Sequence, residues 1–291
     1  MSQQKQHLVK ILQLNFAVLL ISTSGVLGRY IVLHPAVTIF YRTLIASLVF
    51  YLFCRWKKID LKIENKRDLL KIIIAGVLLG GHWVTYFFSL QFSNVAIALL
   101  SLFTYPVITS ILEPFILKTK FNRISILLGV LVLGGVYFLS PQMDFENNYF
   151  LAVILGVVSA FLYALRNILM KREVEKYNGT TLMFYQIVVV AICLFPAVFF
   201  SDFGGVIQQW KPLLTLAVLT TCIGHTLFLL SFRNFTISTA SIMSSMQPVY
   251  GIVLGILFLD EIPSLKTLIG GVLIISAVVI ESSLSFRKKS G

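Results

Sequence analysis

The chain has few charged residues for its length. Of its 291 residues, 12% are charged and 57% are hydrophobic, and the mean hydropathy is +0.89. Soluble domains typically contain about 25% charged residues, which keep their surfaces hydrated. The composition therefore excludes a soluble globular protein.

The sequence also lacks the patterns of metal sites, disulfide frameworks and intramembrane enzymes. Its three cysteines, Cys54, Cys193 and Cys222, lie in apolar stretches, without a Cys-x-x-Cys pair or metal-like spacing to histidine. There is no His-Glu-x-x-His, no pair of helix aspartates and no Gly-x-Ser-x-Gly. We therefore expect packing cysteines and predict no catalytic residue, no metal and no cofactor.

Long apolar runs dominate instead. A bilayer core of about 30 Å is crossed by about 20 helical residues. Ten such segments cover residues 11–31, 36–54, 72–93, 95–117, 124–140, 149–170, 181–200, 212–232, 237–259 and 266–285. The runs are continuous and do not alternate in polarity, which favours helices over a barrel. The sequence predicts an all-α integral membrane protein with ten transmembrane helices.

The net charge of +12 is distributed very unevenly. With a cytoplasmic N-terminus, nineteen Lys and Arg residues fall on the inner side and two, Lys211 and Lys266, on the outer side. This positive-inside bias predicts that both termini are cytoplasmic, as an even number of helices requires. The bias is also a better explanation of the charge than nucleic-acid binding, which we reject. The basic run 55–71 is read as topogenic charge, with binding of anionic lipid headgroups as the alternative.

The two halves of the chain are related. Residues 86–140 laid on 228–282 without gaps give 11 identities in 55 positions, including Pro106 with Pro248. We therefore divide the chain into repeats 1–145 and 146–291. Each holds five helices, and because five is odd the second repeat must enter the membrane from the opposite face. Inverted repeats of this kind are typical of secondary transporters, whose sites lie where the halves meet.

At this point the chain resembles a known family. The stretch Gln247-Pro248-Val249 followed by FLDEIPSLKTLIGGVL at 258–273, and Arg42 within VTIFYRTLIASLVF, are similar to the EamA-type branch of the drug/metabolite transporter superfamily. The first half departs from this pattern, because Thr119 stands where an acidic residue is expected and Glu113 comes earlier. The resemblance implies two inverted five-helix repeats and, most often, export of amino acids or related metabolites.

The two prolines mark the first group of candidate site residues. Pro106 and Pro248 each free a backbone carbonyl one turn earlier, and polar residues surround both, including Tyr105, Gln247 and Tyr250. Inside a bilayer such carbonyls must face protein or a water-filled cavity. We favour a cavity lining, with packed helix kinks as the alternative.

Histidines form a second group. His82, followed by Trp83, and His225 fall at nearly matching positions of the two repeats, near mid-membrane. A single buried histidine usually serves packing, so that interpretation stays open. The near symmetry suggests a pair that lines a central cavity, where histidine can bind substrate or take up a proton.

Charged residues inside the apolar segments form a third group, and each needs a compensating partner. Glu113 and Arg166 lie at similar depth, so we predict an ion pair that either holds helices together or serves the inner gate. Arg42 is expected to stabilise carbonyl ends or bind a phosphate at the outer face, with a substrate carboxylate as the alternative. Arg29, near its helix end, is expected to snorkel.

The leading hypothesis is a secondary transporter, most simply an exporter, of a small metabolite such as an amino acid or related amphipathic compound. Alternating access would occur at a midplane cavity between the repeats. An uptake permease, an intramembrane enzyme and a structural membrane protein are the alternatives. The expected partners are the small-molecule substrate and the lipid bilayer. The sequence is compatible with proton coupling and with either a monomer or a homodimer. The expected location is the inner or plasma membrane.

Overall fold

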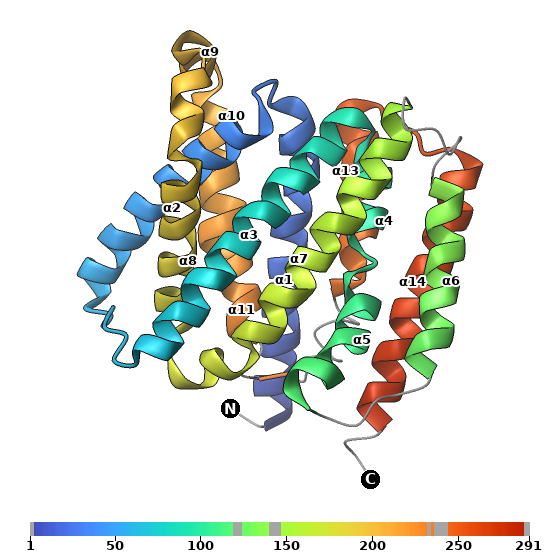
Figure 1. The fold of residues 1–291 in the computed structure, drawn as a ribbon, viewed down its shortest axis with the longest axis horizontal. Helices are drawn as coiled ribbons and strands as arrows, with labels where there is room; N and C mark the ends of the chain where they lie inside the picture. The colour runs from blue at the N-terminus through green and yellow to red at the C-terminus, as the bar shows by residue number, and fades with distance from the viewer. Residues whose placement is uncertain (1–2, 119–123, 140–146, 232–233, 236–243, 288–291) are drawn as a thin grey trace.

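The structure is a computed structural model that describes residues 3–118, 124–139, 147–231, 234–235 and 244–287. These residues form helices joined by short turns (Figure 1). The helices of the first half are α1 (Gln3–Tyr30), α2 (Pro35–Lys57), α3 (Lys66–Phe92), α4 (Val95–Leu102), α5 (Tyr105–Leu117) and α6 (Ile124–Leu139). Those of the second half are α7 (Asn148–Lys176), α8 (Gly179–Leu194), the 3₁₀ helix η1 (Phe195–Phe200), α9 (Phe203–Gln208), α10 (Trp210–Thr215), the π-helix η2 (Leu216–His225), α11 (Thr226–Ser231), α13 (Met246–Leu259) and α14 (Leu265–Arg287).

The prediction of an all-α membrane protein is confirmed. Seven helical stretches of the described chain are long and apolar enough to cross a bilayer. They are Val9–Tyr30, Pro35–Lys57, Lys66–Phe92, Val95–Leu117, Asn148–Lys176, Gly179–Phe200 and Trp210–Ser231. The three other predicted segments fall on shorter apolar helices, Ile126–Leu139, Met246–Leu259 and Leu265–Ile280. Ten crossings and cytoplasmic termini therefore stay predictions.

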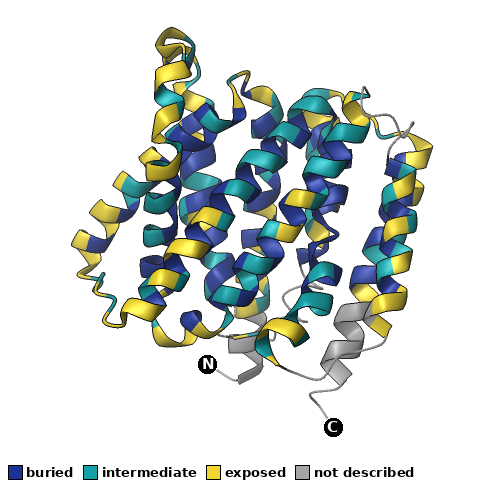
Figure 2. Ribbon diagram, in the orientation of Figure 1, coloured by how far each residue is buried: buried dark blue, intermediate teal, exposed yellow. Residues whose placement is uncertain are grey.

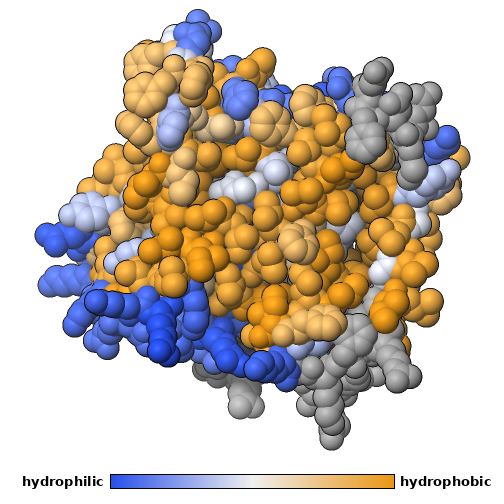
Figure 3. Space-filling model, viewed as in Figure 1, coloured by the Kyte–Doolittle hydropathy of each residue, from blue (hydrophilic) through white to orange (hydrophobic). Residues whose placement is uncertain are grey.

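The outer surface is apolar where a bilayer would surround it. Figure 3 shows a hydrophobic band across the middle of the visible face and a hydrophilic layer beneath it. Large side chains such as Leu48, Leu133 and Val272 are more than 60% exposed, and Figure 2 shows helices with exposed residues on one face and buried residues on the other. The hydrophilic layer, where α2 ends and α3 begins, is called the basic end below, and the other end of the bundle the opposite end.

Two interruptions of the helices matter for the site. The stretch Val95–Leu117 divides into α4 and α5 at Phe103 and Thr104, and Pro106 is the second residue of α5. Proline is favoured at such a start because its nitrogen has no hydrogen to leave unpaired. Pro248 likewise lies in the first turn of α13. In the second half, η2 is a π-helix that ends at His225, and π-helical turns are frequent at functional sites.

Small residues allow two helices to touch closely. A methyl group added to Gly135 of α6 would lie 2.9 Å from the carbonyl oxygen of Gly270 in α14. A methyl group added to Gly270 would lie 2.6 Å from the carbonyl oxygen of Gly135. The backbones therefore meet without side chains between them, as expected for glycine at membrane helix contacts. This pair stands at one side of the bundle, while α3 packs along α7 in front of the core (Figure 1).

Candidate substrate site

A small cavity lies inside the bundle, between helices of both halves. Its volume is about 20 Å³, which is room for about one water molecule. It is lined by Ile21, Ser24, His82, Trp83, Tyr86, Leu102, Tyr105, Tyr163, His225 and Gln247. Five candidates from the sequence, His82, Trp83, Tyr105, His225 and Gln247, are thus brought together, from α3, the start of α5, the end of η2 and the start of α13.

Aromatic rings form much of the cavity wall. The His82 ring stacks on Tyr163 with centroids 4.5 Å apart, and Tyr105 meets Tyr163 edge-on at 4.9 Å. Trp83 contacts His225 edge-on at 5.4 Å. Tyr163 and Tyr86 were not among the residues predicted from the sequence. Tyr86 follows His82 by four residues, so the helical period could have placed both on one face.

His82 is held by a hydrogen bond across to α7. Its Nδ1 lies 2.7 Å from Ser159 Oγ, and Ser159 Oγ donates to the His82 carbonyl at 2.8 Å. Since the hydroxyl has one proton and gives it to the carbonyl, Nδ1 is the donor in this contact and Nε2 is left as an acceptor. His82 is therefore packed against α7 and also lines the cavity, so the structure combines the packing role and the cavity-lining position that the sequence left as alternatives.

The starts of α5 and α13 are tied to the rest of the site. Tyr105 Oη lies 3.0 Å from Ser244 Oγ, and Ser22 Oγ of α1 lies 3.2 Å from the Gln247 carbonyl oxygen. Pro106 and Pro248 are buried beside these bonds but do not line the cavity. Tyr250 packs against a separate apolar cluster around α1.

Arg42 lies in the interior and not at the outer face, which corrects the expectation for it. The residue is fully buried, Nε donates to Thr221 Oγ1 at 2.7 Å, and Nη2 donates to Thr220 Oγ1 at 2.9 Å. Its guanidinium carbon sits 4.1 Å from the centroid of the Trp83 ring. The partners are hydroxyls and an aromatic face, because η2 packs against α2 at this level and covers Arg42.

The predicted Glu113–Arg166 ion pair is wrong. Glu113 pairs with Lys171, while Arg166 Nε donates to Gln186 Oε1 at 2.8 Å. Arg166 also donates from Nη1 to Asn167 and from Nη2 to the Met183 sulfur. The five steps along α7 from Arg166 to Lys171 rotate the second side chain by about 140° relative to the first. Depth alone had suggested the pair, but Arg166 faces α8 and Lys171 faces α5.

Arg29 does not snorkel freely either. Its Nε lies 2.8 Å from Glu261 Oε1, and the Val95 amide donates to Glu261 Oε2 at 2.7 Å. One carboxylate thus pairs with α1 and caps the start of α4, where the helix dipole favours negative charge. This contact connects the two halves at the opposite end of the bundle.

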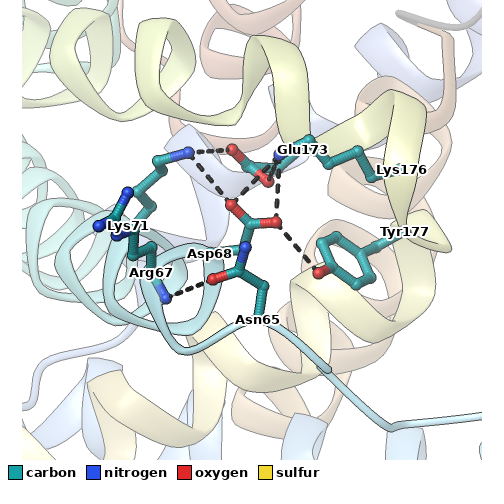
Figure 4. Close-up of polar contacts among 7 residues, drawn as sticks. All are labelled: Asn65, Arg67, Asp68, Lys71, Glu173, Lys176 and Tyr177. Carbon is teal, nitrogen blue, oxygen red and sulfur yellow. Dashed lines mark hydrogen bonds and ion pairs between the residues drawn. The ribbon is translucent and has the colours of Figure 1, made fainter.

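The basic end contains a charge network that sequence reasoning missed (Figure 4). Asp68 of α3 and Glu173 of α7 have side chains 7% and 1% exposed. Lys71 bridges them at 3.2 and 2.8 Å, and Lys176 bridges them at 3.1 and 3.2 Å. Tyr177 Oη donates to Asp68 Oδ2 at 3.1 Å. The signal in the sequence is two acids, Asp68 and Glu173, each flanked by basic residues.

The Tyr177 hydroxyl takes part in this network through its bond to Asp68. Burial and the bond to the Asp68 carboxylate raise the pKa of the Tyr177 hydroxyl above its usual value. The hydroxyl therefore stays protonated and remains a donor to Asp68 at physiological pH.

Comparison with known proteins decides the family. The model of the EamA-like transporter family matches residues 9–140 and again 150–282. The chain belongs to the EamA-like transporter family. It is therefore a multi-pass membrane protein of a transporter family, a finding that points away from an enzyme.

Relatives agree over nearly the whole chain. An uncharacterised transporter, YxxF of Bacillus subtilis, is 26% identical over 285 residues, which cover 95% of this chain and 90% of the relative. The pseudopaline exporter CntI of Pseudomonas aeruginosa is 24% identical over 260 residues, covering 88% of each chain. A protein of known crystal structure matches with a TM-score of 0.68 at 15% identity, covering 96% of this chain and 98% of that one. At this identity the likeness supports the fold alone.

Proposed function

We propose that this EamA-family protein exports a small metabolite, such as an amino acid or related amphipathic compound, by alternating access. The observation that carries the proposal is a cavity lined by residues from both halves, among them His82 and Trp83 from the first and His225 and Gln247 from the second. Transporters built from inverted repeats bind substrate at such an interface. The proposal includes ten crossings in two inverted repeats, with the basic end and both termini in the cytoplasm.

Contacts at both ends of the bundle support an occluded state. The Arg29–Glu261 pair lies at the opposite end, and the network of Asp68 and Glu173 at the basic end. A cavity of about 20 Å³ cannot hold a metabolite, since small-molecule sites usually measure about 300–1,000 Å³. The cavity must therefore enlarge when one end opens, which is what alternating access requires. Export is favoured because one relative, CntI, is a pseudopaline exporter.

Counterflow in proteoliposomes tests the proposal. Untargeted mass spectrometry of cells with and without the protein first identifies metabolites whose internal pool falls when the protein is present. Vesicles loaded with such a compound should then accumulate its labelled form, with saturation and with acceleration by unlabelled compound on the other side. A flux that does not saturate would indicate a channel. A rise of the pools on expression would favour uptake, and no flux of any compound would contradict a transporter.

A further inference from the structure

The interior holds two arginines that form no ion pair with an acid among the described residues. Arg42 and Arg166 are 0% and 2% exposed. The ion pairs found among the described residues use Arg29 and four lysines as their cations, and neither interior arginine takes part. No Asp or Glu lines the cavity in the part of the chain that the structure describes.

Such an arrangement needs an explanation. A guanidinium stays protonated in proteins, and a buried charge without a counter-charge is costly in a membrane interior. Threonine hydroxyls and the Gln186 amide solvate the two side chains in part. They do not neutralise them, so the site around the cavity is positive and disfavours a cationic ligand.

The two arginines differ in their remaining hydrogen-bonding capacity. Arg166 uses all three of its nitrogens, with Gln186, Asn167 and Met183 as acceptors. Arg42 uses Nε and Nη2, whereas its Nη1 is buried and has no hydrogen-bond partner in the part of the chain that the structure describes. Tyr86 lines the cavity, and its buried Oη likewise has no hydrogen-bond partner within the described ranges. Arg42 and Tyr86 therefore offer the spare donors.

Trp83 connects Arg42 to the cavity. One face of the indole covers the guanidinium, with 4.1 Å between the guanidinium carbon and the ring centroid, and the same residue lines the cavity. Tyr86 lies three residues further along α3, on the same side of the helix. A shift of the Trp83 ring, as the closed cavity enlarges, would open Arg42 to a ligand.

We propose that Arg42 is the anion-binding group of the substrate site and that the substrate is a small organic anion. Nη1 binds a carboxylate or phosphate oxygen, Tyr86 Oη supplies a second donor, and the aromatic wall holds the apolar part. This inference rests on the proposed transport function and narrows its substrate to compounds that carry a net negative charge on carboxylate or phosphate groups. A guanidinium is well suited to both groups, because its planar donors match their oxygens.

The test uses the full-length protein in proteoliposomes and a cell metabolite extract divided by anion exchange into anionic and non-anionic fractions. Vesicles are loaded with one fraction, and exchanged compounds are identified by mass spectrometry. We expect exchange from the anionic fraction, and the masses separate carboxylates from phosphates. Exchange confined to the non-anionic fraction would overturn the inference while leaving the transport function intact. Exchange from neither fraction would contradict both.

Variants test whether exchange of anionic compounds depends on Arg42. We expect Arg42→Gln to slow exchange about tenfold or more, the size of a lost hydrogen bond to a charged group, and Arg42→Lys to restore part of it. Lys57→Gln is the matched control, because Lys57 lies at the end of the same helix with its Nζ 4.0 Å from the exposed Trp56 ring. Like Arg42→Gln, the Lys57→Gln change removes one positive charge and one cation–π contact, but it should leave the exchange rate unchanged. Exchange by Arg42→Gln at the wild-type rate would overturn the inference.

A second measurement leaves Arg42 in place, in case its replacement prevents folding. Trp56 and Trp210 are 72% and 53% exposed, so both can be changed to Phe, which leaves Trp83 as the one fluorescent tryptophan. Titration with the anionic fraction should shift Trp83 emission and titration with the non-anionic fraction should not. The reverse pattern, or a response to neither, would count against Arg42 as the anion site.

Discussion

Different contacts join the helices at the two ends of the bundle. At the opposite end, a single pair joins Arg29 to Glu261, with side chains 32% and 17% exposed. At the basic end, two nearly inaccessible carboxylates share two lysines, and each lysine contacts both acids. Among the described residues, the opposite end is thus joined by an ion pair and a helix cap from the same carboxylate, and the basic end by a network of four ion pairs.

This difference predicts which end opens more easily. A partly exposed pair is screened by water and salt and contributes about 0–1 kcal/mol. A buried carboxylate depends on its partners, and breaking such a group costs more because charge is left uncompensated. We therefore expect the occluded state to open first at the Arg29–Glu261 end, with the network at the basic end as the firmer closure.

The largest effect is expected from Glu173→Gln. Loss of this charge leaves Asp68 alone to pair with both lysines, and we expect the protein to lose about 2 kcal/mol of stability and to open at the basic end. The measurement is labelling of Ser24→Cys at the cavity wall by an impermeant thiol reagent, in protein without its native cysteines. Labelling from the basic side should rise several-fold.

Glu175→Gln is the control for this change. Glu175 lies two residues later on α7 and is exposed, so its replacement should alter neither labelling nor stability. Equal labelling in the Glu173 and Glu175 variants would mean that the network does not close the basic end.

A smaller effect is expected from Glu261→Gln at the other end. The change weakens the pair with Arg29 and the cap on the Val95 amide, contributions that together amount to about 1 kcal/mol. Labelling of the same cysteine should rise from the opposite side only. Asp260→Asn is the matched control, because Asp260 is exposed and has a left-handed backbone, φ 54°, that asparagine adopts readily. A rise on the basic side would refute the role of Glu261 in closing the opposite end.

The smallest effect is expected from Glu113→Gln. Its partner Lys171 and Glu113 itself are 32% and 23% exposed, so the pair is worth less than about 1 kcal/mol to stability. We expect slower counterflow from a weakened contact between α5 and α7, with little change in thermal stability. Normal counterflow with an unchanged pH dependence would remove Glu113 from the mechanism and leave the network of Asp68 and Glu173 as the closure of that end.

Part of the site could be predicted from the sequence because it follows local rules. His82, Trp83, Tyr105, His225 and Gln247 were chosen as polar or aromatic residues within apolar helices or beside the prolines, and the structure places all five at one cavity. Helical periodicity and the cost of burying polar groups suffice for such choices. Their part in transport stays a prediction.

Pairing could not be predicted in the same way. Depth along a helix suggested that Glu113 would meet Arg166, but rotation around α7 decides which side chain faces α5. The Arg29–Glu261 pair joins residues 232 positions apart, a separation over which no local pattern carries information.

By itself, the sequence determined that the chain is an all-helical membrane protein, because only long helices satisfy the backbone of so apolar a chain in a bilayer. It also contained the internal similarity around Pro106 and Pro248. The tertiary structure alone decided that the Trp83 ring covers the Arg42 guanidinium, that Arg42 Nη1 has no hydrogen-bond partner among the described residues, and that two buried acids share two lysines at the basic end. Partner choice depends on how helices rotate and pack against one another, which spacing along the chain does not specify.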